Sequence, residues 1–186
     1  MTPTSGTLIC NPDNWSQPIM ETIRRVFNYL ANLEWTERVQ HTCIFCDRSK
    51  LVTIVYEDDD IIAIENRRLA GQLHWLILPK SHTIRDIEAL GGEHLVTLQA
   101  MDRVKNHLLN EHCPGTPQSA ILSGYHRGRR RLAGNIYYPD IISIHHLHLH
   151  VIVRPKLLLR VFKYPTWLPL MWKSDAQVLQ EVRRLA

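Results

Sequence analysis

The chain has 186 residues, of which 45% are hydrophobic and 22% charged, and its formal net charge at pH 7 is +4. These fractions are typical of one globular domain with an ordinary core, and they exclude a low-complexity chain. No apolar run approaches the length that crosses a bilayer, so we expect no membrane partner. The modest positive charge is only a weak indication of anionic ligands.

The first 40 residues are predicted to form an N-terminal extension. From Trp15 to about Arg38 the apolar residues recur at helical spacing, which predicts an amphipathic helix that packs on the core or on a second subunit. Residues 41–186 are assigned to a single domain with a C-terminal helical tail. The apolar positions of the predicted helix are Ile19, Ile23, Val26, Phe27, Leu30 and Leu33.

The N-terminus and the cysteines indicate the compartment. Met1 to Asn14 lacks the charged-then-apolar layout of a secretory signal peptide. The four cysteines, two of them in Cys43-x-x-Cys46, fit a reducing compartment better than a disulfide scaffold. We therefore expect the protein in the cytoplasm, the nucleus or both.

Three strands are predicted next. Leu51 to Tyr56 and Ile61 to Glu65 are rich in β-branched residues and flank an acidic turn, which is typical of a hairpin. His74 to Leu78 is a third strand, which Pro79 ends.

The second half of the chain begins with a helix. Leu95, Leu98, Met101 and Leu108 form one helical stripe between about Glu93 and Glu111.

A short strand is then expected from Ala120 to Tyr125. The tail from Lys156 to Trp172 is rich in Pro and Trp, and Ser174 is placed to cap a final helix.

The stretch from Ser143 to Val153 is predicted to be a buried strand, because its β-branched and aliphatic residues are typical of one. Alternate side chains of a strand share a face, so His146, His148 and His150 are expected to project together, ~6–7 Å apart. A histidine row is a poor core face, but it suits a metal ion or a phosphate.

From His146 to Ile152 the sequence follows the pattern His-φ-His-φ-His-φ-φ, where φ is apolar. This pattern resembles the signature of the histidine-triad nucleotide hydrolases and transferases. The likeness covers about residues 43–155 and is greatest to the Hint branch, particularly its third eukaryotic subgroup, with some features of aprataxin. The resemblance implies an α+β fold, a five-stranded antiparallel sheet with packed helices, and a homodimer.

The resemblance also implies roles for the histidines. His148, the middle histidine, would be the nucleophile that forms a nucleotidyl-histidine intermediate, since neutral imidazole is nucleophilic near pH 7. His150 would donate hydrogen bonds to the phosphoryl oxygens, and Ser143 would contact the leaving group. His74 matches the family's outlying fourth histidine, and His146 completes the triad.

A nucleoside pocket is implied by the same resemblance. Ile44 and Phe45 match a pair that sandwiches the base, and Ile64 matches a second wall of the pocket. Asn66 departs from the family, which usually has an Asp that holds the ribose hydroxyls. An amide still accepts a hydrogen bond but lacks the charge assistance of a carboxylate. Ile44 and Phe45 also suit plain core packing.

Cys43-x-x-Cys46 has standard zinc spacing, and His82 and His146 would complete a Cys2His2 site. Several branches of the superfamily bind zinc at matching positions. Such a closed site would be structural, and the chemistry would need no metal. The alternative is a free thiol pair with a solvated His82.

The expected activity is release of AMP from adenosine 5′-monophosphoramidates, with purine nucleotides as ligands. An aprataxin-like removal of AMP from DNA ends is the alternative within the enzymes. It is favoured by Gly124-Tyr125-His126 and the arginine run that follows, and disfavoured because the C-terminal zinc finger of that family is not found in this sequence. A nucleotidyltransferase of the galactose-phosphate type is less expected, because that branch has Gln where this chain has His150. Two further hypotheses come from different classes of protein. One is a non-catalytic nucleotide-binding regulatory protein, and the second is a zinc hydrolase that uses the histidine row as ligands.

The basic stretch from Arg127 to Pro139 falls where the family normally runs directly into the triad strand. A solvated inserted loop is the favoured interpretation. An arm that contacts nucleic acid is the alternative, so nucleic acid is a less favoured partner.

Overall fold

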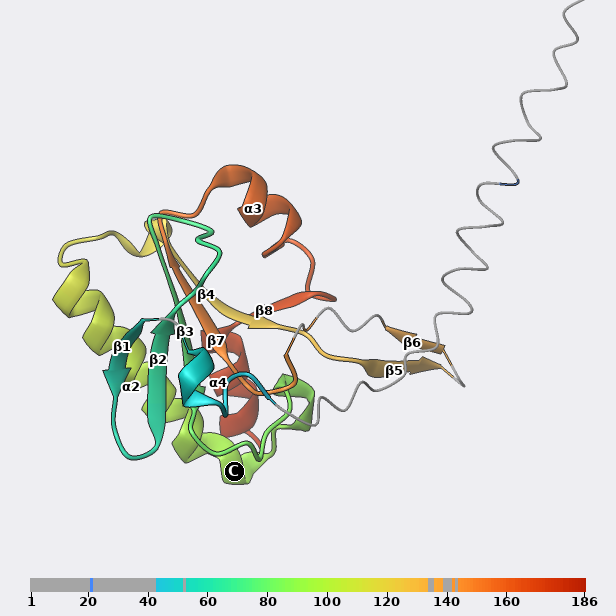
Figure 1. Cartoon of the computed structure of the whole chain (residues 1–186). Coiled ribbons are helices and arrows are strands. Elements are labelled where there is room, and N and C mark those ends of the chain that lie inside the picture. Colours follow the sequence, from blue (N-terminus) through green and yellow to red (C-terminus); the bar gives the residue numbers. More distant parts are fainter. Residues whose placement is uncertain (1–20, 22–42, 52, 134–135, 139–141, 143) are drawn as a thin grey trace, which may run out of the picture. The chain divides into compact units, whose positions relative to one another are not determined.

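The computed structural model describes residues 43–186 except 52, 134–135, 139–141 and 143, together with Glu21 (Figure 1). The N-terminal helix expected between residues 15 and 38 lies outside this part of the chain. That helix and the domain boundary near residue 40 stay predictions. Within the described residues, no helix is both long enough and apolar enough to span a membrane.

The domain is built on one antiparallel sheet with the strand order β1-β2-β3-β7-β4-β8. The sheet and its helices confirm the α+β class, but the predicted five strands are one too few. The extra strand, β8, comes from the tail and pairs with β4. It is too short for alternation to reveal it in the sequence. The strands are β1 (Ile54–Glu57), β2 (Ile61–Glu65), β3 (Leu73–Pro79), β4 (Ile121–His126), β7 (Leu149–Val153) and β8 (Trp172–Ser174).

The helices lie close to their predicted positions. The helix expected at residues 93–111 is α2 (Leu95–His112), and the final helix is α4 (Asp175–Arg183). Ser174 caps α4 as predicted, because its hydroxyl accepts a hydrogen bond of 3.3 Å from the backbone N–H of Gln177. A short helix, α3 (Leu157–Phe162), lies between β7 and β8.

Alternation along the strands gives the sheet two different faces. One face packs against α2 and α4 and forms the main hydrophobic core (Figure 1). On β7 this face carries Leu149, Val151 and Val153, so His150 and Ile152 point to the opposite face. The opposite face therefore carries the polar residues of the sheet centre.

The tail covers part of that opposite face. Leu159 and Tyr164 pack against Leu122 of β4 and Ile152 of β7 in a small hydrophobic cluster that also contains Trp172. Tyr164 is fully buried there. The segment after β7 therefore belongs to the domain and lies beside the central strands.

The predicted strand from Ser143 to Val153 is only half correct. Strand β7 begins at Leu149, and residues 144–146 form a bend. In that bend the backbone N–H of His146 bonds the carbonyl of Ile144, and the N–H of Leu147 bonds the carbonyl of Ile84. These bonds replace the pairing of a strand and end the alternation before β7.

The basic stretch contains a second, two-stranded sheet instead of the expected irregular loop. Its strands are β5 (Arg130–Ala133) and β6 (Ile136–Tyr138), paired antiparallel. The Arg130 guanidinium lies 4.4 Å from the ring centre of Tyr138. Before β5, the Arg127 guanidinium donates to both carboxylate oxygens of Glu88, at 2.7 and 2.9 Å. These contacts hold Arg127 against Glu88 and β5 against β6.

Candidate active site

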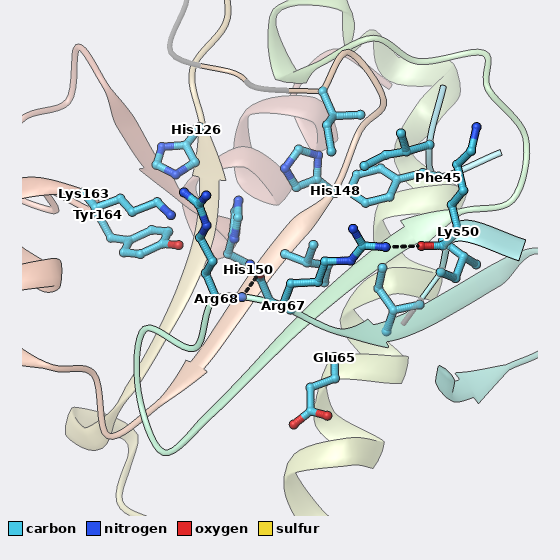
Figure 2. Close-up of a pocket in the computed structure, with 16 residues that line it drawn as sticks. Phe45, Lys50, Glu65, Arg67, Arg68, His126, His148, His150, Lys163 and Tyr164 are labelled. Carbon is cyan, nitrogen blue, oxygen red and sulfur yellow. Dashed lines mark hydrogen bonds between the residues drawn. The ribbon is translucent and has the colours of Figure 1, made fainter. Parts of the chain in front are cut away.

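A cavity of about 560 Å³ opens on the face of the sheet opposite α2 and α4 (Figure 2). The four residues predicted to bind the nucleoside, Ile44, Phe45, Ile64 and Asn66, all line it. The rest of its apolar lining is Leu51, Leu76 and Ile144. Its other polar residues are Lys50, Glu65, Arg67, Arg68, His126, His148, His150, Lys163 and Tyr164.

His148 lies between the apolar and polar parts of the cavity (Figure 2). Its Nδ1 lies 2.6 Å from the carbonyl oxygen of His146, so Nδ1–H donates and Nε2 keeps its lone pair. Burial lowers the pKa of His148, which keeps the ring neutral near pH 7. The edge of the Phe45 ring packs against the imidazole, with ring centres 5.3 Å apart. A neutral, fixed imidazole of this kind is suited to nucleophilic attack.

His150 is next to His148 and is held by His74. Nδ1 of His150 lies 3.0 Å from Nε2 of His74, and Nδ1 of His74 lies 3.2 Å from the carbonyl oxygen of Arg68. The backbone N–H of Ala70 also lies 3.4 Å from Nδ1 of His74, so the pair has two possible arrangements. In one, Nδ1 of His74 accepts from Ala70 and Nε2–H donates to Nδ1 of His150, and in the other Nδ1–H donates to Arg68 and Nε2 accepts from His150. Burial lowers the pKa of His74 to about 4 and that of His150 well below its ordinary value. Both rings are therefore neutral at pH 7.

Asn66 also belongs to this hydrogen-bond network. Its Nδ2 lies 3.2 Å from Nε2 of His74, and its Oδ1 accepts from the backbone N–H of Arg68 at 3.0 Å. The amide thus contacts the histidine network at the edge of the cavity. Ser143, the predicted contact of the leaving group, lies outside the described residues.

The prediction that three histidines share a face is wrong for His146. The bend before β7 turns its fully buried ring away from His148 and His150, whose ring centres are 4.9 Å apart. The side chain of His146 instead faces Cys43 and Cys46, while its carbonyl accepts from His148. The structure therefore places His146 in the predicted metal cluster.

The four predicted metal ligands converge. Their ligand atoms all lie within 4.8 Å of one another. Nδ1 of His146 is 3.5 Å from Sγ of Cys43 and 3.7 Å from Sγ of Cys46, and Nδ1 of His82 is 3.2 Å from Sγ of Cys46. Ligand atoms of a tetrahedral zinc lie roughly 3.5–3.8 Å apart, so the spacing fits a zinc ion.

Hydrogen bonds orient both histidines of this cluster. Nε2 of His146 lies 2.7 Å from the carbonyl oxygen of Pro79, and Nε2 of His82 lies 2.6 Å from that of His145. Each Nε2–H therefore donates to a carbonyl, which leaves each Nδ1 lone pair facing the thiols. Burial raises the pKa of the Cys46 thiol to about 11 without a metal, so metal binding would release its proton.

Sequence reasoning gave no binding role to seven polar residues of the cavity, which are Lys50, Glu65, Arg67, Arg68, His126, Lys163 and Tyr164. His126 ends β4 and lies two residues after Gly124, which pairs with His150. The two histidines therefore share a face, but only the strand register reveals it. Lys163 and Tyr164 follow α3 in the tail, where no motif marked them.

The His-φ-His-φ-His-φ-φ pattern from His146 to Ile152 thus places two neutral histidines, His148 and His150, at a cavity on an antiparallel sheet, which is the arrangement of a histidine-triad site. The family model described as "Scavenger mRNA decapping enzyme C-term binding" matches residues 40–158. The chain belongs to this family, within the histidine-triad superfamily of nucleotide hydrolases and transferases.

Three relatives are similar in sequence. An aprataxin from Danio rerio is 34% identical over 98 residues, which are 53% of this chain and 26% of that protein. A bifunctional adenosine 5′-phosphosulfate phosphorylase/adenylylsulfatase from Arabidopsis thaliana is 28% identical over 141 residues, 73% of this chain and 82% of that protein. An adenosine 5′-monophosphoramidase from Xenopus tropicalis is 28% identical over 126 residues, 66% of this chain and 74% of that protein. The chain spans about a quarter of the aprataxin's length.

A solved structure is similar in fold. A HIT family hydrolase from Clostridium thermocellum has a TM-score of 0.50 and 24% identity, over 62% of this chain and 93% of that chain. At this identity the likeness supports the fold alone.

Proposed function

We propose that the protein hydrolyses adenosine 5′-monophosphoramidates to AMP through a nucleotidyl-histidine intermediate on His148. The observation that carries the proposal is the geometry of His148, whose Nδ1 is occupied by the carbonyl of His146 while Nε2 is left for attack. The relative from Xenopus tropicalis carries the name of this activity. Membership of the histidine-triad superfamily supports hydrolysis of a nucleotide. The choice of a phosphoramidate as the substrate is specific to this proposal.

The steps follow from the residues of the cavity. Nε2 of His148 attacks phosphorus, an N–P bond forms, and the bond to the leaving nitrogen breaks as that nitrogen takes a proton from solvent and departs as the amine. His150, the second residue of β7, stabilises the phosphoryl oxygens by donating its Nε2–H, which requires that Nε2–H of His74 donates to Nδ1 of His150. Water then cleaves the intermediate, which releases AMP and restores His148. His74 holds His150 in place through the 3.0 Å contact.

The apolar part of the cavity is proposed to take the adenine ring. Phe45 and Ile64 are buried in one cluster beside Leu76, so the wall they form is rigid. A flat aromatic base fits such a wall and gains from its burial. Asn66 is placed at the polar edge, where its amide replaces the carboxylate that the family uses for the ribose.

Zinc is proposed as a structural ion on Cys43, Cys46, His82 and His146. The ion would tie the turn at residues 43–46 to the bend at residues 144–146, which lies just before His148. It would supply folding free energy, and the proposed chemistry uses none of its ligand atoms.

A His148→Ala variant tests the activity. It should lose several orders of magnitude in turnover of an adenosine phosphoramidate, because the two-step route requires the nucleophile. The matched control is His107→Ala, at an exposed position of α2 outside the cavity, which should keep its turnover. Brief incubation with labelled substrate should attach acid-labile nucleotide to wild type only. Near-normal turnover by His148→Ala would refute the mechanism.

Removal of AMP from DNA ends is the second candidate, because the aprataxin match has the highest identity of the three relatives described. Adenylated DNA tests it beside the small phosphoramidate, at equal concentrations. A much larger kcat/KM on the DNA would favour this candidate. A homodimer and a location in the cytoplasm or nucleus remain part of the proposal.

A further inference from the structure

The segment that follows the family match contributes one wall of the cavity. Tyr164 and Trp172 lie beyond residue 158, where the match ends. Tyr164 lies 5.2 Å from His126 and 5.4 Å from His150 between ring centres, and Trp172 lies 5.1 Å from His126. This chain therefore surrounds His126 and His150 with aromatic rings of its own tail.

This ring cluster carries unpaired polar atoms. Nε2 of His150, Nδ1 of His126, the hydroxyl of Tyr164 and Nε1 of Trp172 are buried without a hydrogen-bond partner among the described residues. Tyr164 is fully buried and His150 is 5% exposed. Buried polar atoms almost always have a partner, so this concentration of unpaired atoms indicates the place of a polar ligand group.

Positive charge gathers on the same side of the cavity. Figure 2 shows Arg68 and Lys163 near Tyr164, His126 and His150, while Phe45 and Lys50 lie on the other side of His148. Within the described part of the chain, Arg68 and Lys163 have no carboxylate partner. Glu65 is the one carboxylate in the lining, and it points away from this group (Figure 2).

We propose that the group formed by Arg68, His126, Lys163 and Tyr164 binds an oxyanion on the leaving group of the substrate. The base would occupy the apolar side and phosphorus would lie at His148, so the leaving group would reach this polar side. The preferred substrates are then AMP conjugates with an acidic leaving group, either a carboxylate on the amine or a sulfate or phosphate. This inference rests on the proposed function.

Binding tests the subsite without turnover. The variant His148→Asn removes the nucleophile, so conjugates stay intact while calorimetry measures their Kd. The phosphoramidates of glycine and of glycinamide have the same P–N bond and nearly the same shape, but only the first carries a carboxylate. The glycine conjugate should bind about tenfold more tightly or better, since a charge-assisted contact replaces a neutral one. Adenosine 5′-phosphosulfate in a third arm distinguishes a sulfate from a carboxylate.

A second substitution locates the effect. Lys163→Met, added to His148→Asn, should reduce the preference for the glycine conjugate about tenfold. Lys163 is exposed and makes no side-chain hydrogen bond with described residues, so the change should leave the thermal midpoint unaltered. The control is Lys80→Met, because Lys80 pairs with Glu57 outside the cavity and should keep the preference.

The oxyanion subsite and the His148 mechanism can be refuted independently of each other. Equal Kd values for the two conjugates, or equal effects of Lys163→Met and Lys80→Met, would overturn the oxyanion subsite even if His148→Ala abolishes turnover. A clear preference for the glycine conjugate in a protein that keeps turnover without His148 would overturn the mechanism and leave the subsite standing.

Discussion

His74 and His150 are joined by a 3.0 Å contact between Nε2 of His74 and Nδ1 of His150. They lie on adjacent strands, where His150 pairs with Leu76 and His74 pairs with Ile152. The two histidines are therefore diagonal neighbours on one face, a separation that ring side chains can bridge. The contact fixes which nitrogen of His150 faces the cavity.

His74→Phe should reduce kcat more than it changes KM. The substitution keeps a ring in the buried position but leaves Nδ1 of His150 without its hydrogen-bond partner, which costs about 1–3 kcal/mol or roughly tenfold to a hundredfold in rate. Steady-state kinetics on the phosphoramidate measure both constants. His74→Gln, whose side-chain amide can donate to Nδ1 of His150, should recover part of the loss. A loss confined to KM would argue against a positioning role.

The purified protein should carry one zinc ion per chain. Elemental analysis and native mass spectrometry should detect it in wild type and in Cys113→Ser, but not in Cys46→Ser. Cys113 is a suitable control because it lies at the end of α2, away from the cluster. Zinc that persists in Cys46→Ser would refute the ligand assignment.

Removal of zinc should lower the thermal midpoint, because ligation is coupled to folding. The same removal of zinc distinguishes a zinc hydrolase from the proposed enzyme, in which zinc is structural. A hydrolase that used the histidines as zinc ligands would lose activity at once, whereas the proposed enzyme should keep turnover for as long as it stays folded.

Stability should fall as the pH decreases below about 6.5. Burial lowers the pKa of His74 to about 4 and that of His126 to about 3 in the folded state, while the ordinary value is 6.5. Below pH 6.5 the unfolded chain binds protons that the folded chain does not, so each histidine costs up to ~1.4 kcal/mol per pH unit until its folded pKa is reached. Above pH 6.5 both histidines are neutral in the folded and the unfolded chain, so they do not change the free energy of unfolding with pH.

Urea denaturation at several pH values between 7.5 and roughly 5 measures this effect. The variant His126→Gln should show a smaller loss of unfolding free energy over the same interval, since Gln does not titrate. Identical slopes for the two proteins would contradict the assignment of a neutral buried His126.

Replacing Arg129 and Arg131 by Ser should leave both the cleavage of a small phosphoramidate and the affinity for duplex DNA unchanged. Arg127 and Arg130 already contact Glu88, and the Arg129 guanidinium lies 4.1 Å from the ring centre of Tyr137. Much of the positive charge of this stretch is thus engaged within the protein. DNA affinity that falls in the variant and declines steeply with added salt would instead identify a nucleic-acid arm.

Local sequence patterns were sufficient to predict most strands and helices of the domain. Residues rich in β-branched side chains around an acidic turn predicted β1 and β2, the run that Pro79 ends predicted β3, and helical spacing predicted α2. The capping sequence at Ser174 predicted the start of α4. Each of these signals is local, because neighbouring residues alone determine which side chains share a face.

The resemblance identified residues that are far apart in the chain. Cys43 and Cys46 do lie beside His82 and His146, and Ile44, Phe45, Ile64 and Asn66 do line one cavity. The roles of these residues in binding and catalysis stay predictions until the variants are measured.

Only the tertiary structure showed where the His146 side chain points and which residues line the polar side of the cavity. Alternation predicted that His146 would join His148, but the hydrogen bond from Leu147 to Ile84, a residue distant in sequence, bends the chain before β7. His126 approaches His150 through the register of β4 with β7, and Tyr164 through packing of the tail on Leu122 and Ile152. Such long-range contacts leave no local period in the sequence, since they depend on how separate elements pair and pack.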